Sequence, residues 1–341
     1  MPELRIDPLS GHRTIVAGER SRRPGGAPRC EPPLPIERER DPFAEGHEDR
    51  TPPELYARRA PDSSPDGPGW TVRVVPNLFP ALEPPAPGAH DSETALREAP
   101  QGGARGGTPA ELLVALPATG AHEVVINGPQ PVLSLAELPR AQVCDAVEVW
   151  RERMRVHEQS AYVQLIVNER HEAGASLPHT HAQLYALDFV PAAVARERER
   201  ASAYTTRTMG ADLTGDLVAE EVRRGERVVA IDDEAVLIAP FASRLPFQLM
   251  LAPRVPRARF EDDGATGASL LHDGLCRLAR HLGSSPPLNL WVRTAPRGAS
   301  DFCWRIDVMP RLTHIAGLEL STGLNLNIVA PEDAAALLRE A

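Results

Sequence analysis

The feature that most constrains the fold is an order of secondary-structure segments that occurs twice along the chain. Two strands, a long helix with apolar residues at helical spacing and two more strands follow one another in each half. In the first half these segments are residues 69–82, 121–128, 135–160, 161–170 and 174–186. In the second half they are residues 227–241, 247–254, 267–282, 287–296 and 301–311. Because single strands and helices do not alternate, a doubly wound parallel sheet is disfavoured. The order predicts an α+β protein with two related halves, each a mainly antiparallel sheet with flanking helices.

The segments between these elements have simpler patterns. Residues 1–60 are rich in proline, arginine and glutamate, which predicts an extended, turn-filled segment. Residues 83–110 carry glycine, proline and alanine without periodicity, which predicts a mobile loop. Residues 191–224 and 331–341 are predicted to be helical. The boundary between the two halves is expected at residues 190 and 191.

Composition excludes several classes of function. The net charge of -10 leaves no basic excess for a general nucleic-acid binder. The chain has no lysine, so no Schiff-base mechanism is open to it. Its four cysteines form no C-x-x-C pair, which argues against a disulfide framework and a sulfur-rich zinc site. No apolar run approaches membrane-spanning length, and the first residues do not resemble a signal peptide, so we expect a cytoplasmic protein without membrane partners.

The stretch "GASLPHTHAQLYA" (174–186) is the main candidate for a functional site. On a strand, alternate side chains point to opposite faces, so His179, His181 and Gln183 would share one face. The pair of histidines alone fits either a catalytic site or a half-buried structural pair.

The chain resembles the galactose-1-phosphate uridylyltransferase family of the histidine-triad superfamily along nearly its whole length. The matching stretches are "LRIDPLSGHRTIVAGERSRRP" (4–24), "EDRTPPELYA" (48–57), "WTVRVVPNLFPAL" (70–82), "HEVVI" (122–126), "NERHEAGASLPHTHAQLYAL" (168–187) and "MPRLTHIAGLELSTGLNLNIVAPEDAAALLR" (309–339). The resemblance implies two histidine-triad-like halves, with the nucleophile in the first and a degenerate second half. It also implies a homodimer.

The resemblance assigns the covalent nucleophile to His181, the second histidine of the family's His-Pro-His motif, in which Thr180 here replaces the proline. His179 is then a supporting hydrogen-bonding residue. The remaining implied contacts are with the phosphates (Ser176 and Gln183), the nucleotide (Asn77 and Asn168), the diphosphate (Arg20 and Arg23) and, across the dimer, the sugar (Glu319). Arg20 and Arg23 also fit ordinary surface arginines, and both asparagines also fit turn caps.

The chemistry of nucleotidyl transfer suits these residue types. A neutral imidazole can attack the α-phosphorus and hold the nucleotidyl group, which divides one difficult step into two. Its pKa lies near neutrality, so it is unprotonated without extreme tuning. The amide of Gln183 can donate a hydrogen bond to a phosphate oxygen in the transition state.

The metal ligands of the family are largely missing. A structural zinc is typically held by two cysteines, a downstream histidine and the first motif histidine, which correspond here to Asp41, Ala44, Pro131 and His179. A second site uses a glutamate and three histidines, which correspond to Glu197, Pro256, Arg305 and Asp307. We therefore expect no metal and no cofactor, although Asp41, His47 or His122 leaves room for a replacement set.

The expected function is transfer of a nucleotidyl group through His181, between a nucleotide sugar (UDP-hexose) and a sugar 1-phosphate, as in galactose metabolism. One alternative is a nucleoside-diphosphate-sugar or dinucleoside-polyphosphate phosphorylase that uses inorganic phosphate. Another is a catalytically decayed nucleotide-binding module. Retention of both His181 and Gln183 favours an enzyme.

Overall fold

The computed structural model describes residues 1–22, 30–84 and 115–341. Most of the expected loop at 83–110 and Arg23 lie outside these residues. The strands are β1 (Glu3–Ile6), β2 (Arg13–Val16), β3 (Tyr56–Arg59), β4 (Trp70–Pro76), β5 (Gly120–Ile126), β6 (Tyr162–Glu169), β7 (His181–Leu187), β8 (Val228–Ile231), β9 (Ala235–Ile238), β10 (Leu249–Pro253), β11 (Leu288–Arg293), β12 (Arg305–Pro310) and β13 (Leu324–Asn327). The α-helices are α2 (Arg140–Val156), α3 (Ala192–Thr208), α4 (Leu213–Arg224), α5 (Ala268–Leu282), α6 (Gly317–Thr322) and α7 (Pro331–Glu340).

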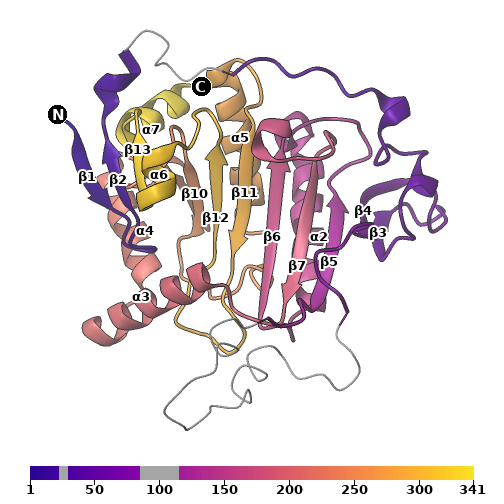
Figure 1. The fold of residues 1–341 in the computed structure, drawn as a ribbon, viewed down its shortest axis with the longest axis horizontal. Coiled ribbons are helices and arrows are strands. Elements are labelled where there is room, and N and C mark those ends of the chain that lie inside the picture. Colours follow the sequence, from indigo (N-terminus) through magenta and orange to yellow (C-terminus); the bar gives the residue numbers. More distant parts are fainter. Residues whose placement is uncertain (23–29, 85–114) are drawn as a thin grey trace.

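A ten-stranded antiparallel sheet forms the centre of the molecule, with the order β3-β4-β5-β7-β6-β11-β12-β10-β9-β8 (Figure 1). From the outer edge to the centre of the sheet, the order is β3, β4, β5, β7, β6 in the first half and β8, β9, β10, β12, β11 in the second. Each strand therefore has a counterpart at the same place in the other half, and the halves meet where β6 pairs with β11. The α+β class and the repeated arrangement are therefore confirmed. Since the sheet and its core run through both halves, the boundary at residues 190 and 191 stays a prediction.

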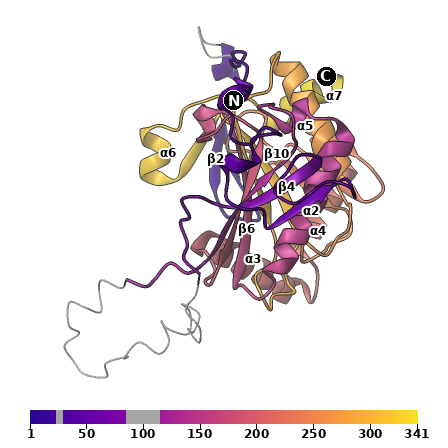
Figure 2. The same ribbon diagram turned by 90° about the vertical axis from the view of Figure 1, so that its right-hand side faces the viewer.

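Helices α2, α5 and α7 pack on one face of this sheet (Figure 2). The side chains of β6 and β7 point alternately to the two faces of the sheet. Their apolar residues, such as Leu165 and Leu184, join the core under these helices. The intervening residues, His181 and Gln183 among them, point to the opposite face, which we call the second face. Burial of one face thus fixes which side chains are available for chemistry on the other.

Several elements differ from the sequence prediction. The segment 227–241 is a hairpin, β8–β9, because the Asp232 side chain accepts hydrogen bonds from the backbone N–H groups of Glu234 and Ala235 and closes a turn. The helix predicted at 135–160 begins only at Arg140, since Pro139 separates it from a short 3₁₀ turn. The segment 191–224 is divided into α3 and α4.

A second, three-stranded sheet was not predicted. It joins β1 and β2, which are antiparallel, to β13, which is parallel to β2. The short 3₁₀ helices are η1 (Gly18–Arg22), η2 (Arg38–Arg40), η3 (Glu48–Arg50), η5 (Leu135–Glu137) and η6 (His171–Ala173). Among the described residues, no helix has the length and apolar character needed to cross a membrane.

Candidate active site

His181 is the first residue of β7 and has the geometry of a neutral nucleophile. Its Nδ1 lies 2.7 Å from the carbonyl oxygen of His179, so this nitrogen carries the hydrogen and donates it. The lone pair is then on Nε2, which has no hydrogen-bond partner within the described residues. The ring is 4% exposed, and its centroid lies 5.2 Å from that of Phe43. Burial lowers the pKa of His181, so the ring is unprotonated at neutral pH.

Gln183 lies two residues further along β7, and the protein fixes its side-chain amide. The carbonyl Oε1 accepts one hydrogen bond from His122 Nε2 at 3.0 Å and another from the Tyr185 hydroxyl at 2.9 Å. His122 Nδ1 accepts from the backbone N–H of Ala81, which leaves the ring hydrogen on Nε2. His122 and Tyr185 also stack, with their ring centroids 4.1 Å apart. With both lone pairs of Oε1 occupied, the NH₂ group of Gln183 is left as a donor for a ligand.

Asn168, on the neighbouring strand β6, is held in a similar way. Val167 pairs with Ala182, so the next residue, Asn168, lies beside His181 on the second face. Its Oδ1 accepts a hydrogen bond of 2.8 Å from Asn289 on β11. Two side-chain NH₂ groups, those of Gln183 and Asn168, thus lie near His181, where they could donate to an anionic ligand.

The ring of His179, like that of His181, packs edge-on against Phe43. Strand β7 begins at His181, and His179 lies beyond the last residue paired with β5. Its ring is completely buried, with Nδ1 2.6 Å from Asp41 Oδ2 and Nε2 2.8 Å from the carbonyl oxygen of Gly128. His179 therefore faces the interior rather than a ligand, and its backbone carbonyl is what contacts His181.

The structure places the other predicted residues in different surroundings. Asn77 follows β4, and its Nδ2 lies 3.1 Å from His122 Nε2, so it belongs to the cluster around Gln183. Ser176 is exposed in the loop before β7, Arg20 is exposed on η1, and Glu319 lies on α6. Among the described residues, no hydrogen bond or ion pair joins the Arg20, Ser176 or Glu319 side chains to His181. Arg23 lies outside the described residues.

Two residues of this cluster, Tyr185 and Asn289, were not singled out from the sequence, and His122 was considered only as a possible metal ligand. Tyr185 could have been found, because it continues the alternation of His181 and Gln183. The roles of His122 and Asn289 could not, since these residues reach the cluster only through the pairing of β5 with β7 and of β6 with β11.

The residues of this chain do not fit the two metal sites that the resemblance implies. At the first, Ala44 and Pro131 offer no ligating side-chain atom. At the second, Arg305 donates to Glu197 at 2.9 Å and to Asp307 at 3.0 Å, so a guanidinium lies between the two carboxylates. Burial would raise the pKa of Glu197, but Arg305 and Arg293 together hold it below its usual value. In the part of the chain that the structure describes, no three His, Cys, Asp or Glu side chains could together hold a metal ion.

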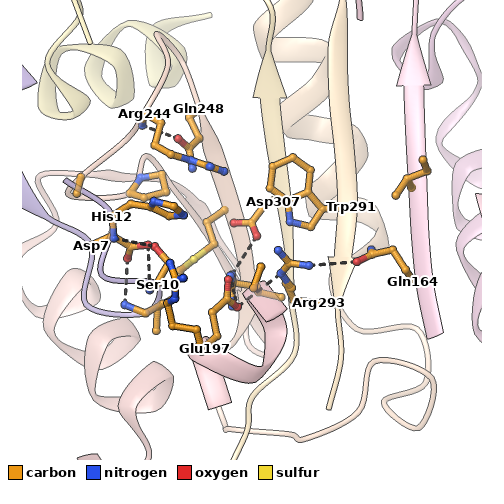
Figure 3. Close-up of a pocket in the computed structure, with 18 residues that line it drawn as sticks. Asp7, Ser10, His12, Gln164, Glu197, Arg244, Gln248, Trp291, Arg293 and Asp307 are labelled. Carbon is orange, nitrogen blue, oxygen red and sulfur yellow. Dashed lines mark hydrogen bonds and ion pairs between the residues drawn. The ribbon is translucent and has the colours of Figure 1, made fainter. Parts of the chain in front are cut away.

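This ion-pair network lines a cavity of about 450 Å³ on the second face, between α3, the central strands and the segment after β1 (Figure 3). Arg244 projects into it and lies over the ring of Trp291, 5.8 Å from its centroid. None of the predicted site residues that the structure describes lines the cavity. Gln164 and Ile166 do, and both are on β6, the strand that carries Asn168. The cavity is therefore a separate, charged hollow that borders the cluster around His181.

Comparison with known families relates the chain to nucleotidyl-transfer enzymes. The model for "Galactose-1-phosphate uridyl transferase, N-terminal domain" matches residues 2–191, and a domain of unknown function matches residues 140–340. An ADP-glucose phosphorylase of Arabidopsis thaliana is 29% identical over 352 aligned positions, which cover 99% of this chain and 93% of that protein. A galactose-1-phosphate uridylyltransferase of Cryptococcus neoformans is 25% identical over 315 positions, which cover 87% of this chain and 76% of that protein.

Solved structures agree with these matches. The crystal structure of an ADP-glucose phosphorylase from Arabidopsis thaliana with bound ADP-glucose has a TM-score of 0.76 and 27% identity. The alignment covers 100% of this chain and 99% of that one. A solved uridylyltransferase has a TM-score of 0.70 at 24% identity and covers 100% of this chain and 98% of its own, which indicates a shared fold. The similarity thus extends over both halves of the chain.

Proposed function

Because the chain belongs to the galactose-1-phosphate uridylyltransferase family, we propose that it transfers the nucleotidyl group of a nucleotide sugar through a covalent intermediate on His181. The observation that carries this proposal is the state of the His181 ring. Its Nδ1 is used by the carbonyl oxygen of His179, so Nε2 is the available nucleophilic atom.

The reaction has two steps. In the first, Nε2 of His181 attacks the α-phosphorus, a nitrogen–phosphorus bond forms, and the bond from that phosphorus to the bridging oxygen breaks as sugar 1-phosphate leaves. The ring becomes positively charged, and its hydrogen bond to the His179 carbonyl stabilises that charge. The NH₂ groups of Gln183 and Asn168 donate to the non-bridging phosphate oxygens as negative charge develops. In the second step, an acceptor phosphate attacks the same phosphorus and frees the histidine.

We propose inorganic phosphate as the acceptor and ADP-glucose as the nucleotide sugar. The similarity to an ADP-glucose phosphorylase over 99% of this chain and 93% of that protein supports this choice. A sugar 1-phosphate acceptor with a UDP-hexose is the second candidate, and it is supported by the match of residues 2–191 to the uridyl transferase domain.

Intact-mass measurement tests the first step. The purified protein is incubated with ADP-glucose or with UDP-glucose, and we expect a mass increase equal to one nucleotidyl group. His181→Asn should abolish the adduct. The matched control His281→Asn, on α5 under the other face of the sheet, should keep it. Tight nucleotide binding without an adduct would contradict the enzyme proposal and indicate a binding module.

Challenge of the isolated adduct tests the second step. Inorganic phosphate should release ADP from an adenylylated protein, whereas galactose 1-phosphate should leave it unchanged. The reverse result would favour the sugar 1-phosphate acceptor.

The proposed homodimer would place Glu319 at the sugar of the neighbouring active site. Ile315, Leu318 and Leu320, on and next to α6, are exposed, which supports a contact there. If each site needs both subunits, mixing the inactive variants His181→Asn and Glu319→Ala should restore part of the activity. No recovery after verified subunit exchange would contradict this arrangement.

A further inference from the structure

Asp41 and His179 form a buried pair directly behind the nucleophile. Their side chains are both 0% exposed, and Asp41 Oδ2 lies 2.6 Å from His179 Nδ1. The other ring nitrogen, Nε2, lies 2.8 Å from the carbonyl oxygen of Gly128. Both ring nitrogens of His179 are thus engaged by the protein, one by the Asp41 carboxyl group and the other by a backbone carbonyl, so the ring is fixed in place.

This pair connects three parts of the chain that surround His181. Asp41 begins the segment 41–47, and its Oδ1 accepts from the backbone N–H of Phe43 at 3.0 Å. The carbonyl oxygen of Asp41 lies 2.7 Å from Nδ1 of His47, which holds the other end of this segment. Phe43 packs edge-on against the rings of both His179 and His181. Gly128 follows β5, and the carbonyl of His179 receives the hydrogen of His181 Nδ1.

Glu169 is a second buried carboxyl group in this region, and it does not bond to the His179 ring. Glu169 approaches from the helix-covered face, but it accepts from Ser134, Thr180 and the backbone N–H of Leu135 rather than from His179. The metal that the family resemblance implies for this region would find no ligand at Ala44 or Pro131. Among the described residues, the Asp41–His179 pair joins segment 41–47 to the residues just before β7.

We propose that Asp41 is a positioning residue for His181: through its buried hydrogen bond with His179 it fixes the nucleophile without a metal. The pair holds the His179 carbonyl in place, and this carbonyl in turn fixes the tautomer and orientation of the His181 ring. The proposal rests on the function proposed above, in which His181 attacks phosphorus. It follows that nucleotidylation should not depend on a bound metal.

Asp41→Asn is the decisive variant, because it keeps the size of the side chain and removes its charge. We expect the rate of His181 nucleotidylation to fall about 10–100-fold, as for other residues that orient a reactive group, with KM for the nucleotide sugar changed less than about twofold. The control Asp49→Asn removes an exposed carboxylate from the same region and should not change the rate. Treatment of the wild type with a chelator should also leave the rate unchanged.

Nitrogen NMR of the histidine rings gives a readout that does not need activity. At pH 8, the His181 ring should carry its hydrogen on Nδ1, and this signal should disappear in His181→Asn. Asp41→Asn should weaken the preference for Nδ1. If Asp41→Asn does not fold, the same comparison is made with His179→Gln. An unchanged Nδ1 signal or an unchanged rate in the folded variant, or loss of activity with removal of a stoichiometric metal, would overturn the proposal. If the wild type forms no adduct while the Nδ1 signal depends on Asp41, the proposed function fails and the positioning role stands.

Discussion

Replacing Gln183 by alanine should slow nucleotidylation of His181 about 10²–10³-fold without a comparable loss of substrate affinity. The protein holds the Gln183 carbonyl with two hydrogen bonds, of 3.0 Å from His122 and 2.9 Å from Tyr185, so the NH₂ group is already oriented before substrate binds. Removing one preorganised donor to a developing oxyanion costs about 3–4 kcal/mol. At about 1.4 kcal/mol for each tenfold change in rate, this corresponds to the expected loss.

Tyr185→Phe provides a graded test of the same reasoning. It removes one of the two bonds that orient the amide but leaves the donor itself in place. A neutral hydrogen bond is worth about 1 kcal/mol, so the rate should fall only about fivefold.

Single-turnover measurement of adduct formation, followed by intact mass over a range of substrate concentrations, separates rate from affinity. Gln159→Ala, an exposed glutamine between α2 and β6, serves as the control and should react like the wild type. The reasoning is refuted if Gln183→Ala reacts within about threefold of the wild type, or if Tyr185→Phe is as slow as Gln183→Ala.

Two further predictions concern buried charges. Burial raises the pKa of Glu169 from 4.5 to about 7, although Ser134 and a backbone N–H donate hydrogen bonds to it. The carboxyl group therefore loses its proton at lower pH in the unfolded chain than in the folded one. As a result, the folded state loses stability as pH rises from 4.5 to 7. In urea unfolding, the free energy of unfolding of Glu169→Gln should rise by up to about 3 kcal/mol relative to the wild type across this interval. A difference between the two proteins that does not change with pH would contradict the raised pKa. Arg305→Met leaves the buried Asp307 without its ion-pair partner and Glu197 with Arg293 alone, so the free energy of unfolding should fall by about 3–5 kcal/mol in the same assay. A loss below about 1 kcal/mol would mean that the network is hydrated.

The sequence predicted the elements that carry the chemistry better than the contacts between them. The alternation of His181 and Gln183 with Ala182 and Leu184 places them on opposite faces of a strand, and this is how β7 is built. The role of Asn289 depends on the register of β6 with β11, which local pattern does not encode. Contacts between residues that are distant in the chain, such as this one, could not be predicted from a single sequence.

His179 illustrates a second limit. It lies outside the paired part of β7, and its ring contacts Asp41, which is 138 positions away in the chain. The resemblance aligned Asp41 with a lost cysteine and so suggested it only as a possible metal ligand. The structure shows instead a carboxylate that meets an imidazole, a pairing that requires the coordinates of both residues.

The small sheet of β1, β2 and β13 has a consequence for biosynthesis. Arg13 pairs with Leu324, so β1 and β2 leave the ribosome long before β13 and cannot complete their sheet until β13 has been made. A hairpin of two short strands is marginally stable alone, so β1 and β2 have no stable fold while the large sheet assembles. Sheet completion by β13 would then act as a late checkpoint, and nascent chains stalled before it would expose this hairpin to proteases.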